Sequence, residues 1–436
     1  MALSTFTHAI SVYQAACQRL PHHFKRRRVF DSASTMMALM QLVAVGRTSY
    51  LNVLEGMARS MGWRTAPTPG ALSQARGKLP MTTTRDVWGA VRESVTASLD
   101  APQSRVADLR VVAIDGTRVL VPDHPEAERR FGRPSWKKGD KKPLPQALVV
   151  LGFDVFSRVP VGASLMRYDG SERVGAMAMT EMLGPGSLAV MDRGFVGKAL
   201  LREMIASGGD VLVRMTTSEA NSWECVYQFL KSGERETTLD LMLPARPGIT
   251  EEPLRVRVRL VRRAFTRGRP RKGQKRETMV LLTTITDANR LSADHLVDLY
   301  AERWGIETLF RDLKTVFNLE AFHSRAPDRI CQEIYAALIW LTLAAAMEYG
   351  AMALIRAKRG RQDPDDPERW QIRRTLLYAF VSARAGELLA GVIEPGGVMA
   401  AAETNITYLA HHAAKRRPER SAPRTTRRPW GRHRAN

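Results

Sequence analysis

Three acidic residues of this sequence are placed so that their carboxylates could act on a phosphodiester. Asp115 and Asp192 each follow a short apolar run, VVAI and SLAVM, and Glu307 lies within the segment YAERWGIETLFRDLK (300–314). Three carboxylates can hold two divalent metal ions about 3.5 to 4 Å apart, which activate a water or a 3′-hydroxyl and stabilise the leaving oxygen. Without metal, clustered carboxylates repel one another and at least one holds its proton more tightly.

The segment 300–314 carries further polar residues on the same side as Glu307. They are Tyr300, Arg303 and Lys314. At about 100° per residue, the four side chains fall in one helical sector about 60° wide. The apolar residues of this helix fill the adjacent sector; they are Leu299, Ile306, Phe310, Leu313 and Phe317. A polar stripe that borders the buried face can line a cleft, whereas purely solvated charges would lie on the far side with Asp312.

The elements that must position these residues begin with a helical region. Residues 1–105 have apolar residues at helical spacing. Two basic stretches of this region are candidate DNA contacts, with a solvated face as the alternative for each. They are FKRRRVF (24–30) and the exposed side of the predicted helix ALSQARGKL, which carries Gln74, Arg76 and Lys78.

A pattern of strands begins at residue 108. Apolar runs typical of strands surround two helical segments, 172–183 and 198–207. The predicted strands are 111–115, 146–154, 159–166, 188–192 and 210–215. Three strands that include a hairpin, then helix, strand, helix and strand, predict a mixed α/β sheet. Ligands bind at the carboxyl ends of strands in such sheets, so an aspartate that ends a strand is a candidate site residue, although a single one could equally cap a turn.

Residues 216–285 break this rhythm and predict a β-rich insertion. LRVRVRLV (254–261) alternates strictly, TMVLLTTI (278–285) is apolar, and a dense basic run (262–277) separates them. So many positive charges between two strands favour a loop that follows the phosphates of a nucleic acid, with a solvated surface loop as the alternative.

The last third of the chain is predicted to be helical up to about residue 413. A long amphipathic helix runs from Ser292 to about Leu319. The apolar run 334–347 is shorter than the roughly 18 to 20 residues that a membrane span needs, so we expect a core helix. The tail 414–436 is basic and has no apolar periodicity. We expect it to be disordered in solution and to add affinity for a polyanion.

The composition indicates a globular protein with a polyanionic partner. The 436 residues include 66 Lys and Arg against 44 Asp and Glu, which gives a net charge of +22. Such a balance favours nucleic acid, because each neutralised phosphate releases a condensed counterion. The three cysteines are far apart and the nine histidines lack metal-ligand spacing. This argues against a disulfide framework or a zinc site and fits a reducing compartment. We expect no signal peptide and no membrane anchor.

Taken together, these motifs resemble those of a known family. The segment 300–314 has the spacing Y-x(2)-R-x(3)-E-x(6)-K, which is the YREK motif of the insertion-sequence-4 family of DDE transposases. DGT at Asp115 and DRGF at Asp192 are similar to the two aspartate motifs of that family and stand in the right order. The β-rich insertion also resembles that of the family, so the resemblance covers about residues 108–350.

The resemblance implies an RNase H-like α/β catalytic core and cut-and-paste movement of a DNA element. The residues that would hold two divalent ions, Mg²⁺ or Mn²⁺, and carry catalysis are Asp115, Asp192 and Glu307. The residues that would bind the phosphates of the transposon ends, and stabilise the DNA hairpin formed on excision, are Tyr300, Arg303 and Lys314. The implied partners are double-stranded DNA, at terminal inverted repeats and at the target, and a second copy of the chain in the DNA complex. The implied location is the cytoplasm, at the nucleoid.

The expected domain layout follows from the same resemblance. Its parts are a helical DNA-binding domain (1–105), the catalytic core (106–215 and 286–330), the β-rich insertion (216–285), a helical C-terminal region (331–413) and the basic tail (414–436). Some members of the family stack a tryptophan of the insertion on a flipped base. For Trp223 we favour core packing over such stacking, and we expect Trp304 to pack against a neighbouring element.

Two alternatives to an active transposase stay open. One is another RNase H-like nuclease, which would cut DNA without joining it. The other is an inactive, domesticated DNA-binding protein, which the intact set of three carboxylates argues against.

Overall fold

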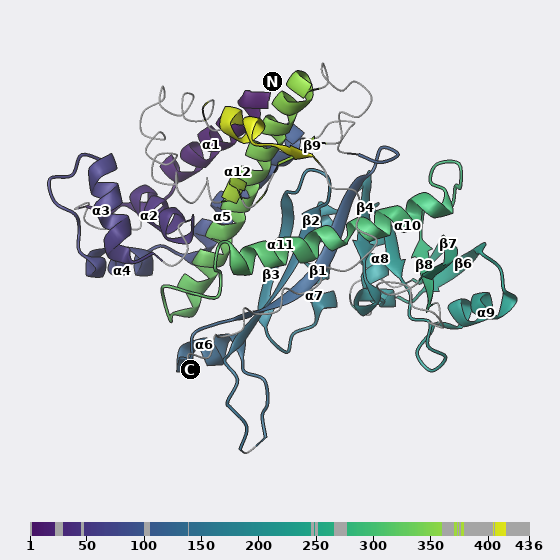
Figure 1. Cartoon of the computed structure of the whole chain (residues 1–436). Coiled ribbons are helices and arrows are strands. Elements are labelled where there is room, and N and C mark those ends of the chain that lie inside the picture. Colours follow the sequence, from purple (N-terminus) through teal and green to yellow (C-terminus); the bar gives the residue numbers. More distant parts are fainter. Residues whose placement is uncertain are drawn as a thin grey trace, which may run out of the picture.

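The computed structural model in Figure 1 describes most of the chain. The described residues are 2–21, 29–44, 48–99, 105–137, 139–245, 248, 252–265, 277–359, 370–372, 374, 376–378, 404 and 406–415. Several predicted features therefore lie outside them. These are residues 24–28 of FKRRRVF, residues 266–276 of the basic run, residues 416–436 of the tail and most of residues 360–405 of the predicted helical C-terminal region.

The helices of the first hundred residues pack around one long apolar helix, α12 (Pro327–Arg359). The N-terminal helices are α1 (Ala2–Gln18), α2 (Ser32–Ala44), α3 (Tyr50–Ser60), α4 (Pro69–Lys78) and α5 (Met81–Leu99). Helix α12 contacts α1, α2 and α5, and Figure 1 shows it running among them. The five helices confirm the prediction that the N-terminal region is helical.

Helix α12 contains the apolar run that we expected in the core. Its segment Pro327–Arg356 is long and apolar enough to cross a membrane, but 72% of its most apolar window is buried inside the protein. Trp340 donates a hydrogen bond from Nε1 to the carbonyl of Met40 at 2.8 Å, which ties α12 to α2. The prediction of a core helix is confirmed.

An eight-stranded sheet forms the other main layer, with strand order β3-β2-β1-β4-β5-β8-β7-β6. Its strands are β1 (Arg110–Leu120), β2 (Gln146–Asp154), β3 (Pro160–Arg167), β4 (Ser187–Met191), β5 (Asp210–Arg214), β6 (Glu236–Leu243), β7 (Leu254–Phe265) and β8 (Glu277–Thr283). Strands β1, β4 and β5 are parallel, and the other neighbours are antiparallel. The predicted mixed α/β sheet is confirmed.

The strands of the predicted insertion continue this same sheet. Strand β8 pairs with β5 of the central strands, and β7 and β6 follow it outwards. The insertion therefore extends the sheet by its edge. The division of the chain into domains stays a prediction.

The remaining helices lie around the sheet. They are α6 (Pro125–Phe131), α7 (Glu172–Met177), α8 (Lys198–Ala206), α9 (Glu224–Ser232), α10 (Ala293–Glu302) and α11 (Trp304–Thr315). Helix α11 contacts β1, and α10 contacts β4 and β5. In Figure 1 these two helices follow one another across the sheet. Two short strands, β9 (Trp370–Gln371) and β10 (Ala414–Lys415), pair with each other.

Candidate active site

Asp115 and Asp192 lie on neighbouring parallel strands. Strand β4 ends at Met191, whose register partner on β1 is Ile114, so each aspartate is the residue after a paired position. Asp192 therefore ends a strand, as predicted. For Asp115 this prediction was wrong, because β1 continues to Leu120 by pairing with β2.

Asp115 faces helix α11. Successive side chains of a strand point to opposite faces, so Asp115 points to the same face as Ala113. The cross-strand partner of Ala113 is Phe153, whose ring lies against Gly305 of α11. Strand geometry thus aims the first carboxylate at the helix that carries the third.

Glu307 lies on helix α11, which begins directly after a break in the predicted helix. The single helix predicted for 292–319 is divided at Arg303 into α10 and α11 and ends at Thr315. Arg303 keeps helical backbone angles, but its N–H bonds to the carbonyl of Tyr300, three residues back. Such a tighter turn interrupts the regular α-helical hydrogen bonds without changing the direction of the chain much.

Arg303 joins two of the three carboxylates. Its Nη1 donates to Oδ2 of Asp115 at 3.3 Å, and its Nη2 donates to Oε1 of Glu307 at 2.9 Å. The Arg303 side chain is only 10% exposed. The guanidinium therefore lies between the carboxylates and balances charge that would otherwise repel.

Tyr300 and Lys314 are also engaged inside the protein. The guanidinium carbon of Arg303 lies 5.8 Å from the centre of the Tyr300 ring, and burial raises the pKa of Tyr300. Lys314 donates from Nζ to the carbonyl of Arg118 on β1 at 2.5 Å and lies 3.6 Å from Glu320. Arg303 and Lys314 thus contact β1, while Tyr300 and Glu307 contact Arg303. The role of the stripe in DNA binding stays a prediction.

The carboxyl group of Asp115 has a raised pKa. Its pKa is raised to about 6, mainly by burial and to a smaller extent by the nearby carboxylates of Asp192 and Glu172, against the lowering effects of the Gly116 N–H and of Arg303. The ordinary value is 3.8. The metal-free site therefore carries more negative charge than its surroundings stabilise.

We expect this strain on Asp115 to appear as a pH-dependent stability difference. Because the folded pKa lies above the unfolded one, the folded protein binds the proton more tightly, and the stability that Asp115 contributes is lost as pH rises from about 4 through about 6. In EDTA, Asp115→Asn should gain stability relative to the unmodified protein over this range, by at most about 3 kcal/mol. Urea unfolding at several pH values measures the difference; a pH-independent difference contradicts the expectation.

The oxygen donors of this site suit a hard divalent cation such as Mg²⁺. Among the described residues, no group of three or more His, Cys, Asp or Glu side chains is arranged to hold a metal ion. The contacts of Arg303 account for this, because the guanidinium holds Asp115 and Glu307 apart on its two sides. The carboxylate oxygens fit a divalent metal ion by their chemistry. In this structure the Arg303 guanidinium supplies the positive charge between Asp115 and Glu307.

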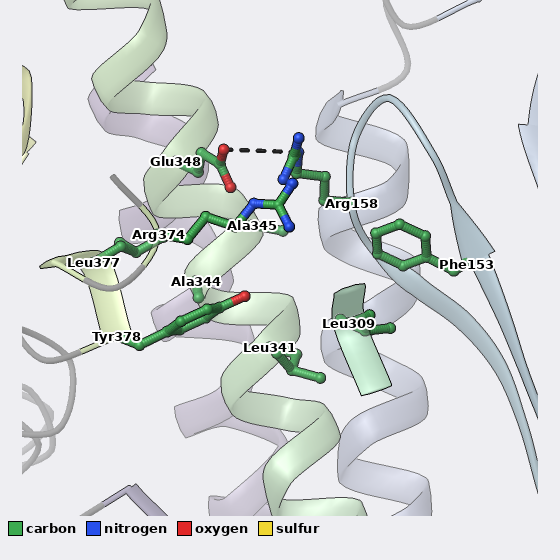
Figure 2. A pocket seen from close by; sticks show the side chains of 10 residues that line it. All are labelled: Phe153, Arg158, Leu309, Leu341, Ala344, Ala345, Glu348, Arg374, Leu377 and Tyr378. Carbon is green, nitrogen blue, oxygen red and sulfur yellow. Dashed lines mark ion pairs between the residues drawn. The ribbon is translucent and has the colours of Figure 1, made fainter. Parts of the chain in front are cut away.

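A small cavity lies behind α11, between α11, α12 and the β2–β3 turn (Figure 2). Its volume of about 10 Å³ is the space that one water molecule needs. Arg158 lies 3.7 Å from Glu348, and Arg374 lies 3.9 Å from Asp312. Asp312 is 9% exposed, so the expectation of a solvated far side was wrong. It lies beside Arg374 and is hydrogen-bonded to Tyr378. The cavity is a small gap in the packing behind α11.

Two other predicted exposures were reversed. Trp304 is 66% exposed, because the next residue, Gly305, makes the contact with the sheet. Arg76 is fully buried, because it pairs with Glu333 of α12 at 2.8 Å. Only Gln74 and Lys78 remain exposed on that side of α4.

Trp223 lies at the start of α9 and is partly buried against the core. Lys198 Nζ lies 5.7 Å from the centre of its ring. These contacts fit the favoured interpretation of packing, while its role toward DNA stays a prediction.

Sequence reasoning missed an exposed tryptophan in a basic loop between α6 and β2. Trp136 is 47% exposed, and Lys142 Nζ lies 5.7 Å from the centre of its ring. Arg133 fixes the base of the loop through ion pairs with Asp123 and Glu128. The sequence WKKGDKK carried the signal, because aromatic and basic residues together are typical of nucleic-acid contacts.

It also missed Glu172, the first residue of α7. This side chain is half-buried and lies against Gly116, next to Asp115. Its position is far from both aspartates in the sequence, so spacing alone could not find it.

Comparisons with known proteins identify the family of the chain. The model of the family "Transposase DDE domain" matches residues 107–343, a range that includes Asp115, Asp192 and Glu307. The transposase InsG for insertion sequence element IS4 of Escherichia coli (strain K12) is 28% identical over 286 residues, 64% of this chain and 60% of the relative. The chain thus spans less than two thirds of that relative's length.

Among solved structures, the chain is similar to the piggyBac transposase in a synaptic complex with hairpin DNA. The TM-score is 0.44 at 11% sequence identity, covering 94% of this chain and 84% of the other. This likeness is too distant to carry an argument. The family model covers more than half of the chain and carries the conclusion, and the IS4 relative agrees with it: the chain belongs to the DDE transposase family.

Proposed function

We propose that this chain moves an insertion sequence by metal-dependent cut-and-paste transposition. The observation that carries the proposal is the meeting of Asp115 and Glu307 on one guanidinium, with Asp192 on the adjacent strand. Neither solvation nor simple core packing would bring three carboxylates from separate elements to the end of one strand pair. Clustering of this kind is costly unless a cation balances it.

Asp115, Asp192 and Glu307 would hold two Mg²⁺ or Mn²⁺ ions in this site. When bound, the ions would activate water and then a DNA 3′-hydroxyl as nucleophile and stabilise the leaving oxygen. The backbone N–H groups of Gly116 and Gly194 already bond to one oxygen of each aspartate, at 2.9 and 2.7 Å. These bonds orient the two carboxylates before any ligand arrives.

Arg303, Tyr300 and Lys314 would bind the DNA. In this proposal Arg303 exchanges its two carboxylates for the phosphates of the transposon end, because a guanidinium forms paired, charge-assisted bonds with phosphate as readily as with carboxylate. Lys314 contacts β1 and Tyr300 lies against Arg303, and both would hold neighbouring phosphates. Together they would stabilise the hairpin formed during excision.

The arrangement of β1 to β5 supports an RNase H-like core. In the order β3-β2-β1-β4-β5, an antiparallel hairpin is joined to three parallel strands, and the two aspartates lie on the adjacent central strands. We propose that the DNA crosses the face of α11 and also meets the basic loop with Trp136. Two transposon ends need two active sites, so the proposed assembly is a homodimer on DNA, in the cytoplasm at the nucleoid.

Excision in cells tests the proposed function. A reporter gene interrupted by the element, with its own terminal inverted repeats, should regain activity when the chain is supplied in trans. Purified reactions should contain a hairpin, which migrates on a denaturing gel at twice the length of one strand of the excised transposon end. Nicks at the inverted repeats without excision or joining would instead indicate a nuclease.

A further inference from the structure

The described residues place a fourth carboxylate, Glu172, beside the two aspartates. Glu172 begins α7, and no hydrogen bond or ion pair of its side chain is found within the described part of the chain. Its oxygens are not among the fully buried side-chain atoms of the described residues that lack a partner. The Glu172 carboxylate is therefore accessible to a ligand.

Gly116, the residue after Asp115, makes room for Glu172, and Gly194 of the second aspartate motif lies next to it. A Cβ added at Gly116 would lie 2.7 Å from both Cγ and Oε1 of Glu172. A Cβ added at Gly194 would lie 3.9 Å from its Oε2 and 2.9 Å from Oδ1 of Asp192. The Glu172 carboxylate thus occupies a space bounded by both aspartate motifs.

Glu172 approaches from the face of the sheet opposite to α11. Gly116 and its cross-strand partner Val150 point to one face, and Val150 lies against Gly175 of α7. Asp115 points to the other face. The two carboxylates can still interact, because β4 ends at Met191 and no strand in the described part of the chain pairs with that edge of β1 beyond this point.

We propose that Glu172 is a fourth carboxylate of the divalent-cation site, contributing charge next to Asp115 and Asp192. This inference rests on the proposed metal-dependent cleavage and adds a residue outside the YREK and aspartate motifs. It also explains why glycine follows Asp115: any larger residue at 116 would push the Glu172 side chain away. Arg303 neutralises Asp115 and Glu307 in the DNA-free protein, which leaves Glu172 and Asp192 to attract the first cation.

Calorimetric titration of the metal-free full chain with Mn²⁺ tests this role. Glu172→Gln should weaken Mn²⁺ binding about tenfold, the effect typical of residues that support metal ligands. Glu181 is exposed and lies nine positions further along the chain. Glu181→Gln removes the same charge and should leave the Mn²⁺ affinity unchanged. Thermal unfolding in EDTA should show that Glu172→Gln is folded and no less stable, because it removes repulsion and breaks no bond.

A double-mutant cycle separates a specific role from a structural one. Gly116→Ala should displace the Glu172 side chain and weaken Mn²⁺ binding to a similar extent. In the Glu172→Gln background, the same substitution should have much less effect, because the charge that it displaces is already absent. Additive effects of the two substitutions would contradict the proposal.

Two results would overturn the inference outright. One is an unchanged Mn²⁺ affinity in folded Glu172→Gln, and the other is the absence of saturable Mn²⁺ binding to the unmodified chain. Failure of the proposed function looks different. In that case Mn²⁺ binds with the predicted dependence on Glu172, but DNA from the borders of the element is not cleaved.

Discussion

Replacing Glu307 with glutamine is expected to slow DNA cleavage by about 10³-fold, the equivalent of about 4 kcal/mol of transition-state stabilisation. Glutamine keeps the size of the side chain but removes the charge that would hold a divalent cation. DNA binding should be retained, because the substitution removes a negative charge and frees Arg303 from its 2.9 Å contact for phosphate. Single-turnover cleavage of labelled border DNA measures the rate, and a gel-shift titration measures affinity.

Glu302→Gln is the matched control for this substitution. Glu302 is exposed at the end of α10, five positions before Glu307, and carries the same charge. Its cleavage rate should stay within about twofold of the unmodified chain, because an exposed charge without a partner in the site contributes little. Equal loss in the two variants would mean that cleavage responds to net charge and not to the site.

The second large effect is expected at the buried ion pair of Arg76 and Glu333, which joins α4 to α12. Arg76 is fully buried, and Glu333 also accepts bonds from the backbone and ring of His323. Burial raises the pKa of Glu333, but Arg76 and His323 outweigh this and hold it below its ordinary value. Arg76→Met should destabilise the protein by about 3 to 5 kcal/mol, because it leaves a buried carboxylate without its main partner. Urea unfolding followed by tryptophan fluorescence measures the loss.

The double variant Arg76→Met, Glu333→Leu is the control. It removes both charges, so no buried charge is left unpaired, and it should recover a large part of the lost stability. A double variant as unstable as Arg76→Met alone would show that the cost comes from lost packing and not from the unpaired charge.

Most strands could be predicted from sequence because apolar period and turn residues are local signals. The β2–β3 hairpin and β4 follow such signals closely. The extent of β1 could not be read in the same way. Residues 116–120 are half polar and form a strand because β2 pairs with them along their whole length.

The site was partly predictable for a related reason. The motifs at Asp115, Asp192 and Glu307 could be recognised along the chain, but their contacts depend on distant partners. Arg303 reaches Asp115 over 188 positions, and Arg76 reaches Glu333 over 257. The break at Arg303 also leaves no periodic signal, because a single tighter turn shifts the helical pattern very little.

The predictions for Trp304 and Asp312 were wrong because the helical-wheel calculation assumed that only one face of the helix is buried. Helix α11 is instead covered on two sides, by β1 and by the cluster behind it in Figure 2. The outcome was that Asp312 is buried and Trp304 lies in solvent. A single sequence carries no information on how many neighbours a helix has.

The most direct test of the proposed function is cleavage of DNA from the borders of the element by the purified chain. With Mg²⁺ or Mn²⁺, we expect strand breaks at the terminal inverted repeats, lost in EDTA and in Asp192→Asn, which keeps the fold because Asp192 pairs only with the N–H of Gly194 among the described contacts. DNA binding without cleavage under every metal condition would contradict the account.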